Sequence, residues 1–442
     1  MTKPVLVTGA SGYIGGRLVP LLLERGNAVR CLVRNRETLP GRGWAGRVEI
    51  VEGDLAGAHS LDKALDGVGT AYYLVHNMSS GRQYPQRDLQ AARNFSAAAD
   101  SAGLEHIIYL GGLADPQARI SAHMRSRIET GDALRSGRVP VTEFRAGVIL
   151  GTGSISFEMI RFLTEQLPIL AGPAWLQNRT QPIAAENVLA YLLAALEDPA
   201  PAGGIYEIGG AQVLTYAGLM LAYARRRGLR RSFFALPGIP VWLMTLLVDR
   251  LTPVPASIAH PLIEGLQADS LVREASARLV FPAVQLLDYE LAIQQAIDSL
   301  APHNVDLVID PRRQAQRLKL DGFLIELRQI RLAARAEVLL AVCRKTGNAA
   351  HGGTGHIENR ESGCSLRWKT GDSPSGQRWT EWRILPEMNG TRLVQIEWFA
   401  PRGLAGFLAW QLAAPVRRWS NIRRLAAVGR LVRRSIALDS LV

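Results

Sequence analysis

A glycine-rich run near the amino end is the segment best suited to chemistry. Residues Thr8–Gly15 read TGASGYIG and lie between a strand-like apolar run and a helix-like stretch. In that setting Gly9 permits a tight turn, Gly12 lets the backbone approach a pyrophosphate, and Gly15 lets helix and strand pack closely. The first turn of the helix presents unpaired N–H groups and a partial positive charge to phosphates. The pattern predicts a dinucleotide-binding loop, with an empty glycine-rich turn as the alternative.

Two charged positions indicate which dinucleotide this is. The second apolar run ends in Leu32-Val33-Arg34, with no acid to hold both hydroxyls of a ribose. An arginine holds a 2′-phosphate by paired, charge-assisted hydrogen bonds, so Arg34 favours NADP(H), and NAD(H) is the alternative coenzyme. Gly53-Asp54-Leu55 follows the third run. The carboxylate of Asp54 is suited to accept a hydrogen bond from the adenine amino group, or it is an ordinary turn residue.

The elements that position these residues alternate along the first 150 residues. Strand-like runs lie at 4–8, 28–33, 48–51, 71–75, 106–110 and 139–144, and helix-like stretches lie at 13–24, 60–65, 82–102 and 121–135. Continuous apolar runs separated by helices are typical of a parallel sheet covered on both faces. The sequence therefore predicts an α/β fold with a doubly wound parallel Rossmann sheet, whose ligand lies at the carboxyl ends of the strands.

From 151 to 300 the pattern changes, and we expect this part to supply the substrate side of a first domain spanning 1–300. Helices are predicted at 157–165, 186–196 and 289–300, and a strand at 205–208. The apolar run Phe233–Val248 contains two prolines and is too short for a bilayer span. We interpret it as a buried or lid helix, with membrane contact as the alternative.

A linker at 301–312 and a separate α+β domain at 313–442 complete the predicted organisation. Strand patterns with a period of two lie at 323–332, 365–369, 378–385 and 391–399, and helices are predicted at 333–344 and at 404–434, the latter broken near Pro415. From residue 401 onward there are eight arginines and one acidic residue, so this tail supplies +7 of the formal net charge of +12. The basic helix is either a solvated face or a surface for anionic lipid.

Composition and spacing exclude several classes of protein. A chain of 442 residues with 48% hydrophobic residues is not wholly disordered. No nucleic-acid-binding signature accompanies the basic charge, so we expect no nucleic-acid partner. His351, His356 and Cys364 match no tight zinc pattern, and we expect no metal site. With Cys31 and Cys343, Cys364 is expected to be a free thiol in a reducing cytoplasm, and the N-terminus shows no secretory signal.

Residues 1–300 resemble the short-chain dehydrogenase/reductase superfamily, in its extended and atypical, epimerase/NmrA-like branches. The resemblance is carried by TGASGYIG at 8–15, LVR at 32–34, GDL at 53–55 and AYYLVHNM at 71–78. It implies that Arg34 meets the 2′-phosphate, and that Asp54 and Leu55 lie at the adenine. It further implies a pyrophosphate site made by Gly9, Ser11, Gly12, Tyr13, Ile14 and Gly15, and a nicotinamide-ribose edge made by Leu74, Val75 and His76.

The chain departs from that superfamily at its catalytic positions. Active members carry a Tyr-x-x-x-Lys pair and a serine, whereas here Gly111 and Gly112 stand at the serine position and His123 and Arg127 replace the pair. His123 is suited to shuttle a proton near neutral pH, and Arg127 stays charged and is suited to hold ribose. We expect an NADP(H)-dependent oxidoreductase for an apolar carbonyl, enone or quinone. The alternative is a non-catalytic NADP(H)-binding redox sensor or assembly protein.

The C-terminal segment resembles a START/SRPBCC-like domain of unknown function with a helix-grip fold. The resemblance is carried by SLRWKT at 365–370, RWTEW at 378–382 and WFAPRGLAGFLAW at 398–410. It implies a curved sheet around a long helix, with a cavity for a small apolar ligand. Five tryptophans either line that cavity or fill the core: Trp368, Trp379, Trp382, Trp398 and Trp410.

Overall fold

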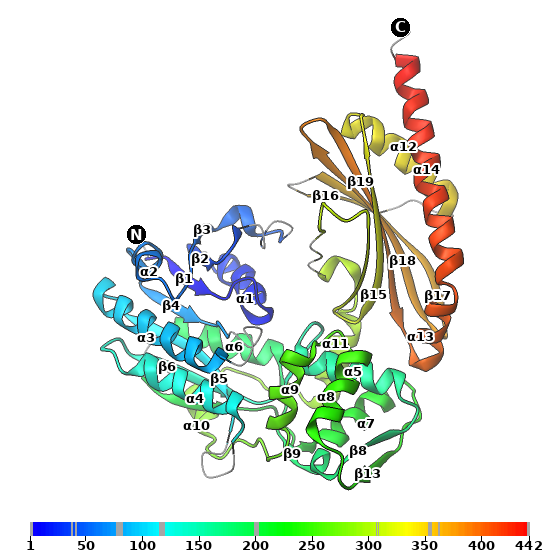
Figure 1. Ribbon diagram of the computed structural model, residues 1–442. Helices are drawn as coiled ribbons and strands as arrows, with labels where there is room; N and C mark the ends of the chain where they lie inside the picture. Colours follow the sequence, from blue (N-terminus) through cyan, green and yellow to red (C-terminus); the bar gives the residue numbers. More distant parts are fainter. Residues whose placement is uncertain are drawn as a thin grey trace. The chain divides into compact units, whose positions relative to one another are not determined.

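The computed structural model describes residues 3–36, 39, 42–76, 83–114, 120–198, 203–305, 307, 309–351, 356–360 and 363–439. The chain divides into two compact units (Figure 1). The first consists of 1–39, 44–164 and 169–299, and the second is formed mainly by 300–442.

A seven-stranded parallel sheet organises the first unit, in the order β11-β6-β5-β4-β1-β2-β3. Its strands are β1 (Val5–Thr8), β2 (Val29–Val33), β3 (Glu49–Glu52), β4 (Thr70–Tyr73), β5 (His106–Gly112), β6 (Val141–Ala146) and β11 (Ile205–Ile208). The strand order reverses between β1 and β4, and such switch points are where doubly wound sheets bind ligands. The predicted α/β class with a parallel Rossmann sheet is confirmed.

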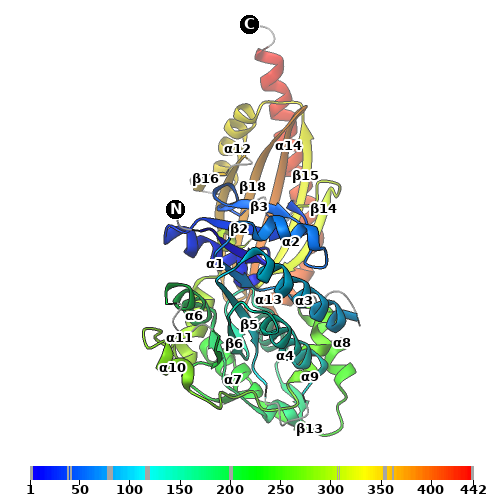
Figure 2. The same cartoon turned by 90° about the vertical axis from the view of Figure 1, so that its left-hand side faces the viewer.

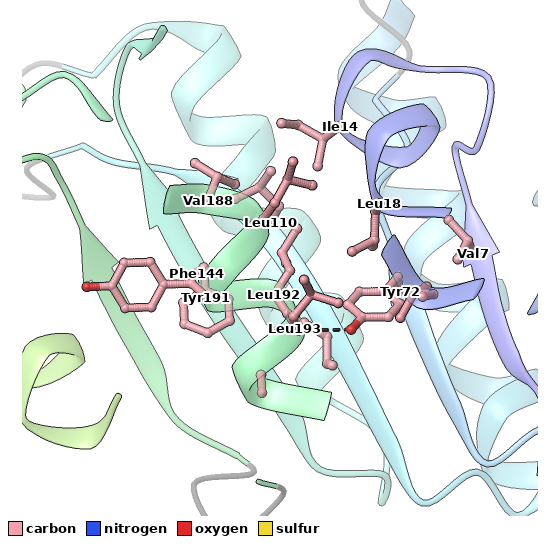
Figure 3. Packing of buried hydrophobic residues seen from close by; sticks show 14 of the residues in the cluster. Val7, Ile14, Leu18, Tyr72, Leu110, Phe144, Val188, Tyr191, Leu192 and Leu193 are labelled. Carbon is pink, nitrogen blue, oxygen red and sulfur yellow. Dashed lines mark hydrogen bonds between the residues drawn. The ribbon is translucent and has the colours of Figure 1, made fainter. Parts of the chain in front are cut away.

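Helices cover both faces of this sheet. They are α1 (Tyr13–Glu24), α2 (Ala58–Leu65), α3 (Tyr84–Ala102), α4 (Ala122–Arg135) and α6 (Ala185–Glu197). Because neighbouring residues of a strand point to opposite faces, Tyr72 packs in the core under α1 and α6, while Tyr73 packs in the core under α2, α3 and α4. Figure 3 shows the first of these cores, where the Tyr72 hydroxyl donates to the Leu192 carbonyl at 2.8 Å. On the other face α3 and α4 lie side by side (Figures 1 and 2).

The rest of the first unit is mainly helical. Its helices are α5 (Ile155–Gln166), α7 (Tyr216–Arg226), α8 (Val241–Leu251), α9 (Ala256–Gly265), α10 (Ser276–Val280) and α11 (Tyr289–Asp298), with 3₁₀ turns at Ala45–Arg47 and Ala174–Gln177. Three short strand pairs join them: β7 (Ile149–Leu150) with β10 (Ile183–Ala184), β8 (Leu170–Pro173) with β13 (Phe233–Leu236), and β9 (Arg179–Thr180) with β12 (Leu214–Thr215).

The run Phe233–Val248 is not the single buried helix that its apolar character predicts. It forms strand β13, a turn, and the first part of α8. Pro237 and Pro240 end regular structure there because proline lacks an N–H and restricts the residue before it. Phe234 is 55% exposed and Trp242 is 63% exposed. The interpretation of this run as one buried helix is therefore wrong, and the lid alternative stays a prediction for α8.

An antiparallel sheet organises the second unit, in the order β14-β15-β19-β18-β17-β16. Its strands are β14 (Ala315–Leu320), β15 (Phe323–Leu332), β16 (His356–Arg360), β17 (Gly363–Ser373), β18 (Gly376–Glu387) and β19 (Gly390–Pro401). The helices are α12 (Ala336–His351), α13 (Gly403–Leu412) and α14 (Ala414–Asp439), and a 3₁₀ turn spans Pro302–Asn304. The predicted break of the long basic helix lies between α13 and α14, where Pro415 is tolerated in the first turn of a new helix.

Each face of this second sheet has its own core. Helices α12 and α14 cover one face, where Trp368 and Trp382 are buried against Leu339 and Val428 (Figure 1). On the other face, Val305 and Leu307 of the segment expected to be a linker join a core around Trp398, Phe323 and Ile396. Among the helices that the structure describes, none is both long enough and apolar enough to cross a bilayer.

Candidate functional site

The glycine-rich loop between β1 and α1 excludes a side chain at two of the three predicted positions, Gly9 and Gly15. Gly9 has a φ of 73°, and a Cβ placed on it would lie 2.7 Å from the carbonyl oxygen of Leu74. The N–H of Gly12 donates to the Gly9 carbonyl at 2.9 Å, which closes the turn. A Cβ on Gly15 would overlap that same carbonyl. The loop therefore leaves backbone, and no side chains, where a pyrophosphate would approach, and it fits a dinucleotide.

The first turn of α1 adds a polar end to this loop. No side chain caps the helix, whose N-cap is Gly12, so its first N–H groups face outward as in an anion site. Ser11 is exposed, Tyr13 is half-buried, and Ile14 and Gly15 are buried. The Tyr13 ring is fixed by a neighbour, since the Arg17 guanidinium lies 4.0 Å from its centroid.

The residues expected at the adenosine end follow β2 and β3. Arg34 is exposed directly after β2 and forms no ion pair among the described residues, so its guanidinium is available to a ligand. Asp54 is also exposed, and its Oδ1 accepts the Ala56 N–H at 3.0 Å in a tight turn. Leu55 is buried in the core under α2 and α3. The structure thus places Arg34 and Asp54 at the carboxyl edge of the sheet, and Leu55 beneath it.

The end of β4 lies against the glycine-rich loop. The Thr8 hydroxyl donates to the Tyr72 carbonyl at 3.0 Å and accepts the Leu74 N–H at 3.2 Å, which ties β1 to the segment that follows β4. Leu74, Val75 and His76 are half-buried there. This part of the predicted nicotinamide edge is therefore next to the predicted phosphate loop.

A chain of three side chains connects this edge to α3 and α4. His76 Nδ1 lies 2.8 Å from Asp88 Oδ2, and His76 Nε2 lies 3.0 Å from His123 Nδ1. His123 is in the first turn of α4, which Ser121 caps by accepting the Met124 N–H. Both histidines were predicted from the sequence, whereas Asp88 and the contact between the two rings were not. A polar residue on the buried face of the amphipathic 82–102 pattern was the available signal.

Burial sets the protonation of this Asp88–His76–His123 chain. Burial lowers the pKa of His76, although the hydrogen bond that His76 donates to the Asp88 carboxylate opposes the shift. Burial, and then the nearby His76 and Arg127, lower the pKa of His123 to about 3. Both rings are therefore neutral at neutral pH, so His123 does not titrate there by itself as the sequence suggested. With Asp88 accepting from His76 Nδ1–H, His76 Nε2 accepts from His123 Nδ1–H, and His123 Nε2 carries a lone pair.

Arg127 is held by the sheet. Its guanidinium donates to the Leu110 carbonyl and lies 5.0 Å from the centroid of the Tyr109 ring, and the Tyr109 hydroxyl donates to the Arg127 carbonyl at 2.8 Å. Its nearest partners are thus in β5. A Cβ on Gly112 would lie 2.8 Å from Met124 Sδ, so a larger residue there would require the flexible Met124 side chain to move.

Trp368, Trp382 and Trp398 of the second unit fill its cores. Trp382 and Trp398 are fully buried, and Trp368 and Trp382 contact edge to face with centroids 5.5 Å apart. Cys364 is half-buried. The described residues contain no group of His, Cys, Asp and Glu side chains that could hold a metal ion. Residues 352–355, between His351 and His356, lie outside the described part.

Comparison with known proteins gives a family and a fold. The model of the NmrA-like family matches residues 1–297. The ceramide reductase of Caulobacter vibrioides is 27% identical over 252 residues, which cover 55% of this chain and 77% of that protein. A 3β-hydroxysteroid dehydrogenase/Δ5→4-isomerase of Mycobacterium tuberculosis is 30% identical over 139 residues, 30% of this chain, so the match spans about a third (35%) of that relative's length.

Two solved structures share the fold of the first unit. Citrobacter sp. triphenylmethane reductase has a TM-score of 0.55 and 20% identity, covering 67% of this chain and 99% of that chain. The NADPH-dependent quinone oxidoreductase from Escherichia coli, solved with NADPH, has a TM-score of 0.54 and 16% identity, covering 66% of this chain and 99% of that chain. At these identities the similarity establishes the fold alone.

Proposed function

Since the chain belongs to the NmrA-like family over residues 1–297, we propose that its first unit is an NADP(H)-dependent reductase for a small apolar carbonyl compound, enone or quinone. The observation that carries this proposal is the Asp88–His76–His123 chain beside the glycine-rich loop. The relatives support the substrate class, because their names describe reductases of a ceramide, a quinone and triphenylmethane dyes.

Different residues at the carboxyl edge of the sheet would bind different parts of the coenzyme. Arg34 would hold the 2′-phosphate and so favour NADP(H) over NAD(H), and Asp54 would meet the adenine. The pyrophosphate would lie on the backbone of Gly9, Ser11, Gly12, Tyr13, Ile14 and Gly15, and the nicotinamide ribose would lie along Leu74, Val75 and His76. When bound, the reduced coenzyme supplies a hydride.

The chain's own contribution is a proton. In the proton-loaded state, the Asp88 carboxylate stabilises an imidazolium at His76, whose Nε2–H donates to His123 Nδ1, so that His123 presents an Nε2–H. As that proton passes to the substrate oxygen, the Nε2 proton of His76 moves to His123 Nδ1. One proton leaves the chain, and the neutral arrangement described above remains. This relay replaces the tyrosine of related enzymes.

The test is oxidation of NADPH, followed by its absorbance, across a panel of quinones and aldehydes. We expect turnover by the wild type, and for His123→Ala a rate about 10²–10⁴ lower with unchanged NADPH affinity, the usual range for a lost proton donor. His260→Ala is the matched control, since His260 is exposed on α9, where its Nδ1 lies 3.8 Å from Glu264 Oε1. Tight NADPH binding without turnover on any substrate would instead support a redox sensor or assembly protein.

A second candidate function, attachment to an anionic membrane surface, is favoured by the outer side of α13 and α14. Large apolar side chains are exposed there at spacings of three or four residues: Leu404, Leu408, Leu412, Val416, Trp419 and Ile422, with exposures from 38% to 80%. Helix α14 carries seven of the eight arginines of the basic tail. An exposed apolar stripe with basic residues beside it is typical of a helix that lies in a lipid interface. We propose an anionic bilayer as its partner, to which each exposed arginine near the surface contributes about 1 kcal/mol.

Vesicle cosedimentation tests this attachment with the full chain. We expect binding to vesicles containing phosphatidylglycerol, release by salt, and loss of binding in Leu412→Glu and Trp419→Glu. Leu279→Glu is the matched control, because Leu279 is 83% exposed in the first unit. Removal of 417–442 is unsuitable, since α14 supplies Val428 and Val432 to the core. Equal binding to neutral vesicles, or no effect of the two substitutions, would contradict the proposal.

A further inference from the structure

One face of the second sheet changes from apolar to polar along its strands. Where α12 covers it, Trp368 and Trp382 are packed against aliphatic side chains. On the same face, Thr380 lies two residues from Trp382 along β18, and its strand partner is Glu397. Thr370 lies at the register shift of β17 between Lys369 and Gly371. A cavity of about 420 Å³ lies between this polar part and α14. That volume is within the range of small-molecule sites, about 300–1,000 Å³.

Three arginines line this cavity: Arg378 from β18, and Arg417 and Arg424 from α14. Arg378 forms no ion pair among the described residues, although it lies 5.6 Å from the Phe399 ring centroid. The contact of Arg424 with Glu397 is long, with 3.9 Å between Arg424 Nη1 and Glu397 Oε1. Glu397 is the one acidic side chain among the lining residues, so the lining carries an excess of positive charge.

Two buried polar atoms in the lining have no hydrogen-bond partner among the described residues. Arg417 is 91% buried, and its Nε donates to Glu326 Oε2 and its Nη1 to the Trp410 carbonyl, both at 2.9 Å. Its Nη2 has no hydrogen-bond partner among the described residues, and neither has the buried hydroxyl oxygen of Thr370. Burying a polar group without a partner is costly, so such groups in a cavity indicate a ligand.

Acceptors in the same cavity define the rest of the ligand. The Glu397 carboxylate is 4% exposed and accepts from the Thr380 hydroxyl at 3.0 Å and from Gln395 Nε2 at 3.2 Å. Gln395 Nε2 also donates to Asn421 Oδ1 at 2.9 Å. These contacts hold the carboxylate in place beside the arginines, where it can accept a hydrogen bond from a ligand hydroxyl.

The geometry points to a binding site in the second unit for a small hydroxylated organic anion, carrying a phosphate or a carboxylate. The guanidinium groups of Arg378, Arg417 and Arg424 would hold the anionic group, and Glu397 would accept from the hydroxyl. This chemistry differs from the apolar ligand expected of a START/SRPBCC-like cavity, and it is independent of the reductase proposed for the first unit.

Calorimetric titration of the full chain with glycerol 3-phosphate and with malate tests the site, with glycerol as the neutral probe. We expect both anions to bind and glycerol not to bind. Arg378→Gln and Arg424→Gln should each weaken binding about tenfold or more, because a charge-assisted contact is lost. Arg378 and Arg424 are more exposed than Arg417, the third arginine of the lining. Their variants should therefore keep the thermal unfolding temperature of the wild type. Arg378→Lys should bind with intermediate affinity.

Two controls separate this site from other basic positions. Arg434→Gln removes an exposed arginine of α14 that does not line the cavity, and it should change the affinity less than twofold. Arg34→Gln removes the arginine proposed for the coenzyme phosphate, and it should leave both anions bound. No heat from either anion, an equal loss in Arg434→Gln, or a loss confined to Arg34→Gln would overturn the proposal.

Discussion

Replacing Asp88 by asparagine should move the pH dependence of NADPH oxidation to lower pH. The amide oxygen of asparagine can still accept from His76 Nδ1–H, so the geometry of the relay is kept while the negative charge is lost. The proton-loaded relay is a cation that this carboxylate stabilises at 2.8 Å. The variant should therefore give up its extra proton at a lower pH than the wild type.

The size of the shift follows from that one contact. A hydrogen bond to a charged group contributes about 1.5–3 kcal/mol, and one unit of pKa corresponds to about 1.4 kcal/mol. The apparent pKa of the relay should then fall by about one to two units. Burial already lowers the pKa of both His76 and His123, so at pH 7 the rate lies on the falling side of the profile. The rate at pH 7 should drop about 10- to 100-fold and recover as the pH falls.

The assay is kcat/KM from pH 4.5 to pH 8 for the wild type and Asp88→Asn, with NADPH affinity measured at both ends. Asp132→Asn is the control, because it removes one negative charge from α4 at a side chain that is 64% exposed and pairs with Arg135. Its profile should match the wild type. A uniform loss of activity at every pH, or a parallel loss of NADPH affinity, would refute the relay and leave Asp88 a structural role.

Three further outcomes follow from the first unit. Gly15→Ala places a Cβ against the Gly9 carbonyl, so calorimetry should show NADPH affinity reduced about tenfold or more while the fold persists by circular dichroism. Arg34→Ala should weaken NADPH binding about 10- to 100-fold and leave NADH binding unchanged, and equal changes would contradict the role of the guanidinium. Burial lowers the pKa of His106 to about 4, below its unfolded value of about 6.5, so the unfolded chain binds more protons between these values. Urea titrations should show the unfolding free energy falling by up to about 1.4 kcal/mol per pH unit below 6.5, and His106→Gln, which can keep the bond to Thr142, should flatten that slope.

The local pattern of the sequence was sufficient for most elements. The helix at 13–24 and the strands at 205–208 and 323–332 have the predicted bounds, because apolar periodicity and breaker residues act within a few positions of one another. Strands β14 and β16 were missed. They are edge strands with polar sequences, AQRLKL and HIENR, and they exist because a neighbouring strand pairs with them.

Two corrections show where local pattern is insufficient. The apolar run Phe233–Val248 contains no information on what covers it, and the fold leaves Phe234 and Trp242 exposed. The tryptophans of the second unit identify a core, but the cavity there is lined by Arg378 and Arg417, whose strand and helix meet only in the folded unit.

By itself, the sequence determined the glycine-rich loop, because the positive φ of Gly9 and the contact of Gly15 with the Gly9 carbonyl both arise within seven residues. It also determined the doubly wound class, through the alternation of apolar runs and helices. Only the tertiary structure decided the relay, since Asp88, His76 and His123 come from α3, the end of β4 and α4, and packing of those helices on the sheet brings them within hydrogen-bonding distance. The same packing removes water from both rings, and that loss of solvation sets the protonation state on which their chemistry depends.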